Sequence, residues 1–159
     1  MGHYDFYKDK IKADVTEVEV AHLLCEKLSF LEFKGRSVGK DREKDLIFND
    51  NRPDSKKSEM LIEVKEDFYC QKSGNVAVEY FDGDHYSGIN ATKADYWVYK
   101  VHEPSTAIGY YIMPTRELKR LITEKKYHRD LAGGDKGETY MYLFHLEDIQ
   151  SISVKFHKE

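Results

Sequence analysis

Three ionisable residues on two neighbouring predicted strands have the types and spacing of a metal-binding site. Glu63 and Lys65 lie two residues apart in the apolar segment 59–65 (EMLIEVK), and Asp45 begins the earlier segment 45–48 (DLIF). Alternate side chains of a strand share a face, so Glu63 and Lys65 point the same way, about 7 Å apart along the strand. A hairpin through the polar loop 49–58 would bring Asp45 beside Glu63.

This arrangement predicts chemistry on a phosphate group. Two carboxylates this close repel each other unless a cation lies between them. Carboxylate oxygens are the ligands that Mg²⁺ prefers, with water and phosphate filling its remaining positions. Lys65 would lie next to a metal-bound water, where it could orient or deprotonate that water, or stabilise negative charge that develops on the phosphate.

The elements that must position these residues follow from hydrophobic periodicity. Thr16 is typical of a helix N-cap, with Glu19 as its capping-box partner, and the apolar spacing predicts an amphipathic helix over 17–30 that ends near Gly35. We expect a loop or weak edge over 35–44, and Pro114 with Thr115 opens a second helix over 115–127. The predicted strands are 45–48, 59–65, 75–81, 95–101, 107–113, 140–146 and 152–156, with a short helical turn near 91–93.

The size and composition favour one globular domain. The chain has 159 residues, of which 40% are hydrophobic and 34% charged, which suits one domain with a substantial core. The order of elements predicts the α/β class, with a central mixed β-sheet flanked by helices. There is neither a run of roughly 20 apolar residues nor a secretory signal, so we expect a cytoplasmic location and no membrane partner.

The order of an acidic helix, a strand opened by Asp45 and a strand with E-x-K resembles the PD-(D/E)xK nuclease superfamily. Two later segments resemble its small phage-type and bacterial-type members: G-N-x-x-x-E at 74–79 and G-I-x-x-T-K-A-D-x-W at 88–97. The resemblance covers about 15–125 and leaves 126–159 as a C-terminal extension of the same domain. One departure is Lys44, which stands where the family's nominal motif has proline.

The resemblance implies a restriction-endonuclease-like core (α-β-β-β-α-β) and a deoxyribonuclease that uses Mg²⁺, with Mn²⁺ as a substitute. The implied metal ligands are Asp45, Glu63 and the Val64 carbonyl, and Lys65 is the implied catalytic lysine. Glu17 is the implied helix acid, with Glu19 as the close alternative. The implied site is also lined by Glu79 and Lys93.

The charge balance argues against binding nucleic acid through overall charge, because 25 Lys and Arg face 29 Asp and Glu, a formal net charge of −4. Positive charge is instead concentrated in two segments, which predict the DNA contacts: Lys34, Arg36, Lys40 and Arg42, then Arg116, Lys119 and Arg120. A homodimer is a further option, because nucleases that cut both strands often pair.

Two other interpretations stay open. One is a catalytically inactive module that keeps the nuclease fold and binds nucleic acid or serves a structural or interaction role. The other is an unrelated α/β domain with surface acids, which a separation of Asp45 and Glu63 above about 8 Å would favour, since one Mg²⁺ with ligands at about 2.1 Å could not bridge them. No zinc-ligand spacing and no phosphate-binding glycine loop is present.

Overall fold

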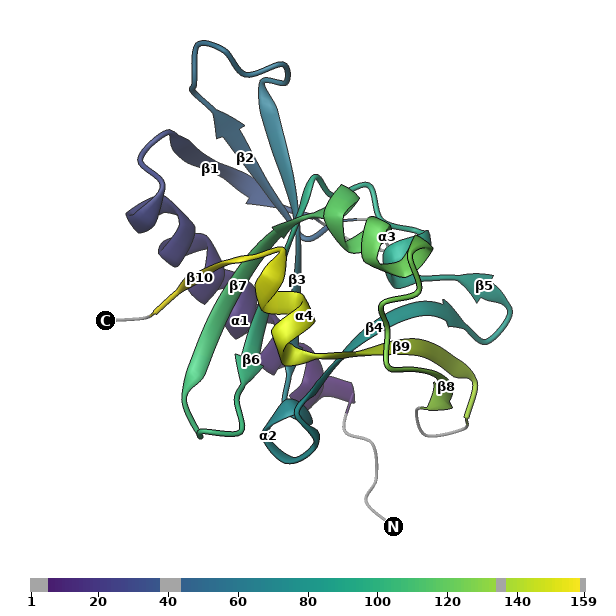
Figure 1. Cartoon of the computed structure of the whole chain (residues 1–159). Helices are drawn as coiled ribbons and strands as arrows, with labels where there is room; N and C mark the ends of the chain where they lie inside the picture. The colour runs from purple at the N-terminus through teal and green to yellow at the C-terminus, as the bar shows by residue number, and fades with distance from the viewer. Residues whose placement is uncertain (1–5, 38–43, 134–136, 158–159) are drawn as a thin grey trace.

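A six-stranded mixed sheet forms the centre of the domain (Figure 1). The computed structural model describes residues 6–37, 44–133 and 137–157, and side chains from residue 13 onwards. The helices within these ranges are α1 (Phe6–Lys27), α2 (Cys70–Ser73), the 3-10 helix η1 (Gly88–Asn90), α3 (Thr115–Thr123) and α4 (Leu146–Ser151). The strands are β1 (Leu31–Arg36), β2 (Leu46–Asp50), β3 (Glu59–Asp67), β4 (Asn75–Asp82), β5 (His85–Tyr86), β6 (Tyr96–His102), β7 (Ile108–Pro114), β8 (Arg129–Gly133), β9 (Thr139–His145) and β10 (Val154–Phe156).

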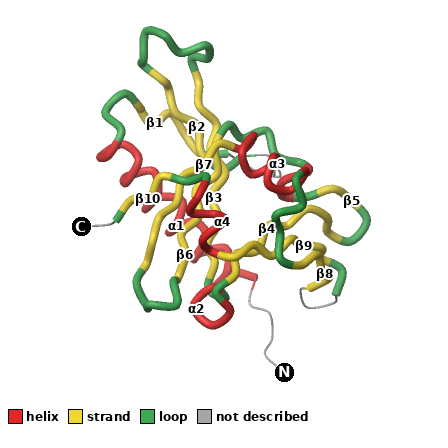
Figure 2. Tube along the Cα trace, in the orientation of Figure 1, coloured by secondary structure: helices red, strands yellow, loops and turns green. Residues whose placement is uncertain are grey.

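The strand order of the large sheet is β1-β2-β3-β6-β7-β10. Only the β3–β6 pair is parallel, and the other neighbours are antiparallel. A second sheet of four strands, in the order β5-β4-β9-β8, lies to one side, as the strand colouring of Figure 2 shows. The α/β class with a single mixed central sheet is therefore confirmed. Among the described helices, none is both long and apolar enough to cross a membrane.

Two apolar clusters pack on opposite faces of the large sheet. On one face, Val20 and Leu24 of α1 pack against Ile62 and Val98. On the other face, Trp97 and Met113 pack against the second sheet, α3 and α4. The even-numbered residues of β3 therefore face α1, while Glu63 and Lys65 face the second sheet, because side chains alternate along a strand.

Residues after 125 complete both sheets. Strand β10 pairs with β7 in the large sheet, and β9 lies between β4 and β8 in the small one. Phe144 of β9 and Ile149 of α4 are fully buried in the core. The segment expected as a C-terminal extension is thus part of the packed domain, although β8 and α4 were not expected.

The expected boundaries of the first helix are wrong. Helix α1 begins at Phe6 and ends at Lys27, so Thr16 lies inside it rather than capping it. The Thr16 hydroxyl donates a hydrogen bond to Glu66 Oε1 at 2.7 Å. The span 6–16 is free of proline and glycine, so it continues the helix, although Val15 is exposed and lies outside the core. Strand β1 occupies part of the span expected to be the helix end and a loop.

Candidate active site

The β2–β3 hairpin brings Asp45 against Glu63. Leu46 pairs with Ile62 across the hairpin, and the Asp45 N–H donates to the Ile62 carbonyl at 2.9 Å. The Asp45 side chain then accepts the Val64 N–H at Oδ2, at 2.8 Å. Asp45 is therefore fixed opposite Glu63 at the point where β2 begins. Because the N–H and C=O of one strand residue point to the same edge, the Val64 carbonyl also lies on the Asp45 side of β3.

Glu63 is a buried carboxylate with one oxygen left unsatisfied. The residue is 5% exposed, and its Oε1 lies 3.0 Å from Lys65 Nζ. Its Oε2 is buried and has no hydrogen-bond partner among the described residues. A buried polar atom without a partner is costly, and one that persists in a native fold points to a bound water or ion. The donor set of Asp45, Glu63 and the Val64 carbonyl consists only of oxygens, which fits a hard divalent cation.

The electrostatics of this carboxylate pair favour binding a cation. Burial raises the pKa of Glu63 to about 7, Lys65 lowers it, and the Asp45 charge raises it further. Burial also raises the pKa of Asp45, while the hydrogen bond from the Val64 N–H and the charge of Lys65 partly oppose this rise. Without metal, Glu63 therefore holds a proton for part of the time at neutral pH. A divalent cation between the two carboxylates would displace that proton and stabilise both charges.

Lys65 stays charged in this setting. Burial alone would lower the pKa of Lys65, but the ion pair with Glu63 and the charge of Asp45 outweigh it and raise the pKa. Its Nζ also lies 5.7 Å from the centre of the Trp97 ring, over an aromatic face that attracts cations. A protonated lysine donates hydrogen bonds and stabilises negative charge, so this geometry favours that role over removing a proton from water.

The two acids of α1 have different surroundings. Burial raises the pKa of Glu17, the hydrogen bond from Arg36 opposes the rise, and the Asp45 charge adds to it, so Glu17 lies within electrostatic reach of the cluster. Glu19 instead accepts the Tyr110 hydroxyl and pairs with Lys100 Nζ at 2.8 Å. Of the two candidates for the helix acid, Glu17 is the one near the carboxylate pair.

A cavity connects Glu17 to the β3 residues of the cluster. It has a volume of about 310 Å³, and Glu17 lines it together with Val64 and Lys65. Such a volume is large enough for several water molecules, since one occupies about 30 Å³ in the liquid. The cavity therefore leaves space for water between α1 and β3, and neither Asp45 nor Glu63 lines it.

Glu79 approaches the cluster from the second sheet. Its charge contributes to the raised pKa of Lys65. Gly88 has φ +51, and a Cβ on it would lie 2.1 Å from the Glu79 carbonyl oxygen, so only glycine permits this approach of η1 to β4. Lys93 is exposed in the loop that precedes β6.

The T-K-A-D-x-W segment at 92–97 has a structural role that the sequence did not reveal. The Thr92 hydroxyl oxygen accepts the Ala94 N–H at 3.1 Å and the Trp97 indole N–H at 3.3 Å. Asp95 accepts the Leu61 N–H at 2.9 Å and thereby ties the loop to β3. These contacts fix β6 against the strand that carries Glu63.

Two of the residues expected to contact DNA, Lys34 and Arg120, already pair with acids. Lys34 pairs with Glu59 at 2.5 Å, near the start of β3. Arg120 pairs with two acids of its own helix region, Glu117 at 2.8 Å and Glu124 at 2.5 Å. These two cations are therefore at least partly neutralised, a fact that basic sequence clusters alone do not convey.

The other expected DNA contacts differ in setting. Arg36 lies beside the cluster, where its Nε donates to Glu17 Oε2 at 2.9 Å and its Nη2 to Asp14 Oδ1 at 2.7 Å. Arg116 and Lys119 are exposed on α3. The remaining two, Lys40 and Arg42, lie outside the described residues.

Comparisons with known proteins leave the site to be judged on its geometry. No protein-family model, curated protein or solved structure matches the chain. Among residues 6–37, 44–133 and 137–157, no group of three or more His, Cys, Asp or Glu side chains is arranged to hold a metal. The candidate ligand set contains only two carboxylate side chains, Asp45 and Glu63, and its third ligand is the backbone carbonyl of Val64. It therefore does not amount to a group of three such side chains.

Proposed function

We propose that this protein is a Mg²⁺-dependent endonuclease that hydrolyses phosphodiester bonds in DNA. The observation that carries the proposal is the pair of half-buried Asp45 and buried Glu63, in which one Glu63 oxygen has no partner in the described chain and a charged Lys65 lies beside it. Buried carboxylates are destabilising unless a cation or hydrogen bonds compensate them, so a protein that keeps them there gains something else from them.

The order of elements supports the same proposal. Helix α1 is followed by β1, β2, β3 and the short α2, and β6 then joins β3 in parallel. If the four-residue α2 is counted as the second helix and 75–90 as an insertion, we infer from this order a match to the α-β-β-β-α-β order of the restriction-endonuclease-like core. Asp45 precedes the second strand and the Glu63–Lys65 pair lies on the third, as the resemblance to PD-(D/E)xK nucleases requires.

In the proposed reaction, Asp45, Glu63 and the Val64 carbonyl hold the metal ion. A bound Mg²⁺ supplies Lewis-acid chemistry, since it makes a coordinated water easier to deprotonate and neutralises charge on the phosphate. Lys65 remains protonated and donates a hydrogen bond to the phosphate or to the attacking water, and Glu17 acts from α1 on the water shell of the site. Mn²⁺ also prefers oxygen ligands and is expected to substitute.

Cleavage of a supercoiled plasmid tests the proposal. The wild-type protein is expected to convert the plasmid to nicked or linear forms with Mg²⁺ or Mn²⁺ but not with EDTA. Glu63→Gln and Lys65→Ala are expected to lower the rate by at least 10²-fold, a typical loss for a group that stabilises transition-state charge. Glu32→Gln, a change at an exposed carboxylate of the edge strand β1, is the matched control and should cleave normally.

Two outcomes would count against this function. If the wild type and both site variants cleaved equally well, the activity would not belong to this cluster. If purified wild type bound DNA but did not cleave DNA with either metal, the chain would be a nuclease-fold binding module instead.

A further inference from the structure

A groove with several charged lining residues opens between the β2–β3 hairpin and the start of α3. It consists of two adjoining cavities of about 440 Å³ and 400 Å³. Arg116 lines the larger cavity and Leu61 the smaller one. The residues that line both are Lys56, Lys57 and Glu59. Because Leu61 and Glu63 lie two residues apart on the same face of β3, the groove leads toward the candidate active site.

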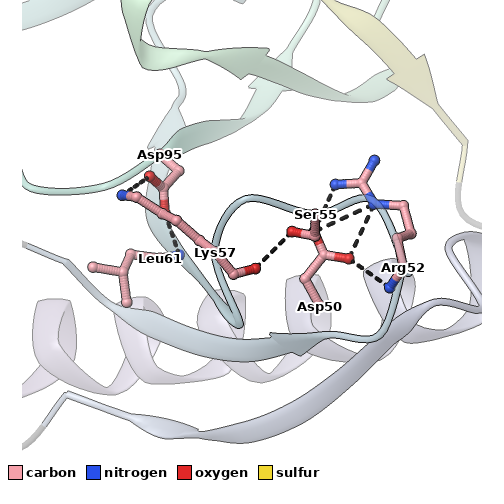
Figure 3. Close-up of polar contacts among 6 residues, drawn as sticks. All are labelled: Asp50, Arg52, Ser55, Lys57, Leu61 and Asp95. Carbon is pink, nitrogen blue, oxygen red and sulfur yellow. Dashed lines mark hydrogen bonds and ion pairs between the residues drawn. The ribbon is translucent and has the colours of Figure 1, made fainter.

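Hydrogen bonds and ion pairs hold the walls of this groove in place (Figure 3). Asp95 accepts the Leu61 N–H at 2.9 Å and pairs with Lys57 Nζ at 2.8 Å, which joins the hairpin to the loop before β6. Within the hairpin loop, the Ser55 hydroxyl donates to the Lys57 carbonyl at 2.6 Å. The groove is thus largely preformed, so a ligand would need to order little of the chain on binding.

The charges of the groove leave two cations uncompensated. Each acid that lines it already has a cationic partner: Asp50 with Arg52 at 2.6 Å, Asp95 with Lys57 at 2.8 Å and Glu59 with Lys34 at 2.5 Å. Lys56 and Arg116 are exposed, on opposite walls, and neither forms an ion pair with another residue in the described part of the chain. Two such charges across a groove fit a polyanion better than a neutral ligand.

We propose that this groove binds the phosphate backbone of the DNA strand as it leaves the candidate active site, with Lys56 and Arg116 as the phosphate contacts. The inference rests on the proposed function, which supplies the anionic substrate. Glu59, which lines the groove where β3 begins, precedes Glu63 by four residues, or about 13 Å along β3, which matches roughly four base pairs of B-DNA at about 3.4 Å each. Contacts to phosphate carry no base information, so the groove positions DNA without selecting its sequence.

Salt-dependent DNA binding tests the groove without any need for catalysis. The Glu63→Gln protein is titrated with a fluorescent 20-base-pair duplex between 50 and 200 mM KCl. Lys56→Ala and Arg116→Ala, added singly to this background, should each reduce the slope of log K against log salt by about 0.9, and by about 1.8 together. Lys72→Ala, which removes an exposed lysine of α2 beyond the opposite end of β3, is the matched control and should leave the slope unchanged.

The outcomes separate the groove from the catalytic proposal. A reduced slope with no plasmid cleavage by wild type would support the groove and reject the nuclease. An unchanged slope with normal cleavage would overturn the groove and leave the nuclease standing. Displacement of the duplex by polyglutamate at equal charge concentration would also overturn the groove proposal, since it would assign this surface to an acidic protein partner.

Discussion

Replacing Glu63 by glutamine should stabilise the metal-free protein while it removes activity. Glutamine has nearly the shape of the protonated glutamic acid but never carries the charge that is costly to bury at 5% exposure. Residues that serve a bound cation rather than the fold often lower stability in its absence. The variant therefore separates a functional carboxylate from a structural one.

The magnitude follows from the pKa of Glu63, which is about 7 in the folded protein against an ordinary value of 4.5. Because the pKa of Glu63 is higher in the folded state than in the unfolded state, the folded chain keeps the proton up to a higher pH. The contribution of Glu63 to stability is therefore fully present below pH 4.5 and is lost as the pH rises through 7. At about 1.36 kcal/mol per pKa unit, the loss is roughly 3 kcal/mol overall, most of which falls between pH 5 and pH 8.

Thermal unfolding in EDTA measures this difference. Relative to wild type, Glu63→Gln should gain roughly 2–3 kcal/mol of stability between pH 5 and pH 8, or roughly 5–10 °C in Tm for a chain of this size. Glu59→Gln should show no such pH-dependent gain. Mg²⁺ at 100 times its Kd should stabilise wild type by about 2.7 kcal/mol but leave Glu63→Gln nearly unchanged. A Tm difference between Glu63→Gln and wild type that stays constant or shrinks from pH 5 to pH 8 would refute the reasoning.

Two further predictions concern the elements that surround the cluster. In urea titrations, Gly88→Ala should lower the free energy of unfolding by at least 2 kcal/mol, because the added Cβ would clash with the Glu79 carbonyl oxygen. Gly83 has φ +64 but open space around it, so Gly83→Ala should lower the free energy of unfolding by only about 1–2 kcal/mol. Equal losses of unfolding free energy in the two variants would show that η1 shifts to accommodate the added Cβ. In calorimetry, Glu17→Gln should weaken Mn²⁺ binding. Glu19→Gln should lower Tm but leave the Mn²⁺ Kd unchanged, because Glu19 pairs with Lys100. Weaker Mn²⁺ binding by Glu19→Gln but not by Glu17→Gln would make Glu19 the helix acid.

The strands and their faces could be predicted because their patterns are local. The alternation in EMLIEVK correctly indicates β3, and the hairpin through 49–58 sets Asp45 opposite Glu63, as expected. Strands β6 and β7 were also predicted within about one residue of their bounds, since long apolar runs between turn signals indicate buried central strands.

The N-terminal half of the first helix was missed, although Tyr7, Ile11 and Val15 recur at a spacing of four residues, which is typical of a helix. The spacing of Val20, Leu23 and Leu24 marks only the part that packs on the large sheet. The T-x-x-E string at 16–19 imitates a capping box, yet both side chains bind partners far along the chain: Thr16 binds Glu66, and Glu19 binds Lys100. Such tertiary partners leave no signal in the local sequence.

The neighbourhood of the site was harder to predict than its central residues. Spacing alone brings Asp45, Glu63 and Lys65 together, but the pairing of Arg36 with Glu17 depends on how β1 lies against α1. A count of basic residues therefore overestimates the positive surface near the carboxylates. Nothing in the sequence distinguishes Lys56 from the other residues of its polar loop. Only its position across the groove from Arg116 indicates a role in binding.

The most direct test of the central claim, that Asp45 and Glu63 hold a divalent cation, is anomalous diffraction from crystals soaked in Mn²⁺. We predict one strong anomalous peak at about 2–2.5 Å from a carboxylate oxygen of each residue and from the Val64 carbonyl oxygen. Glu63 Oε2, which has no partner in the described chain, is expected to be one of those ligands. The absence of a peak at this position at saturating Mn²⁺, with Glu63 Oε2 instead bound to a water or a side chain, would contradict the account.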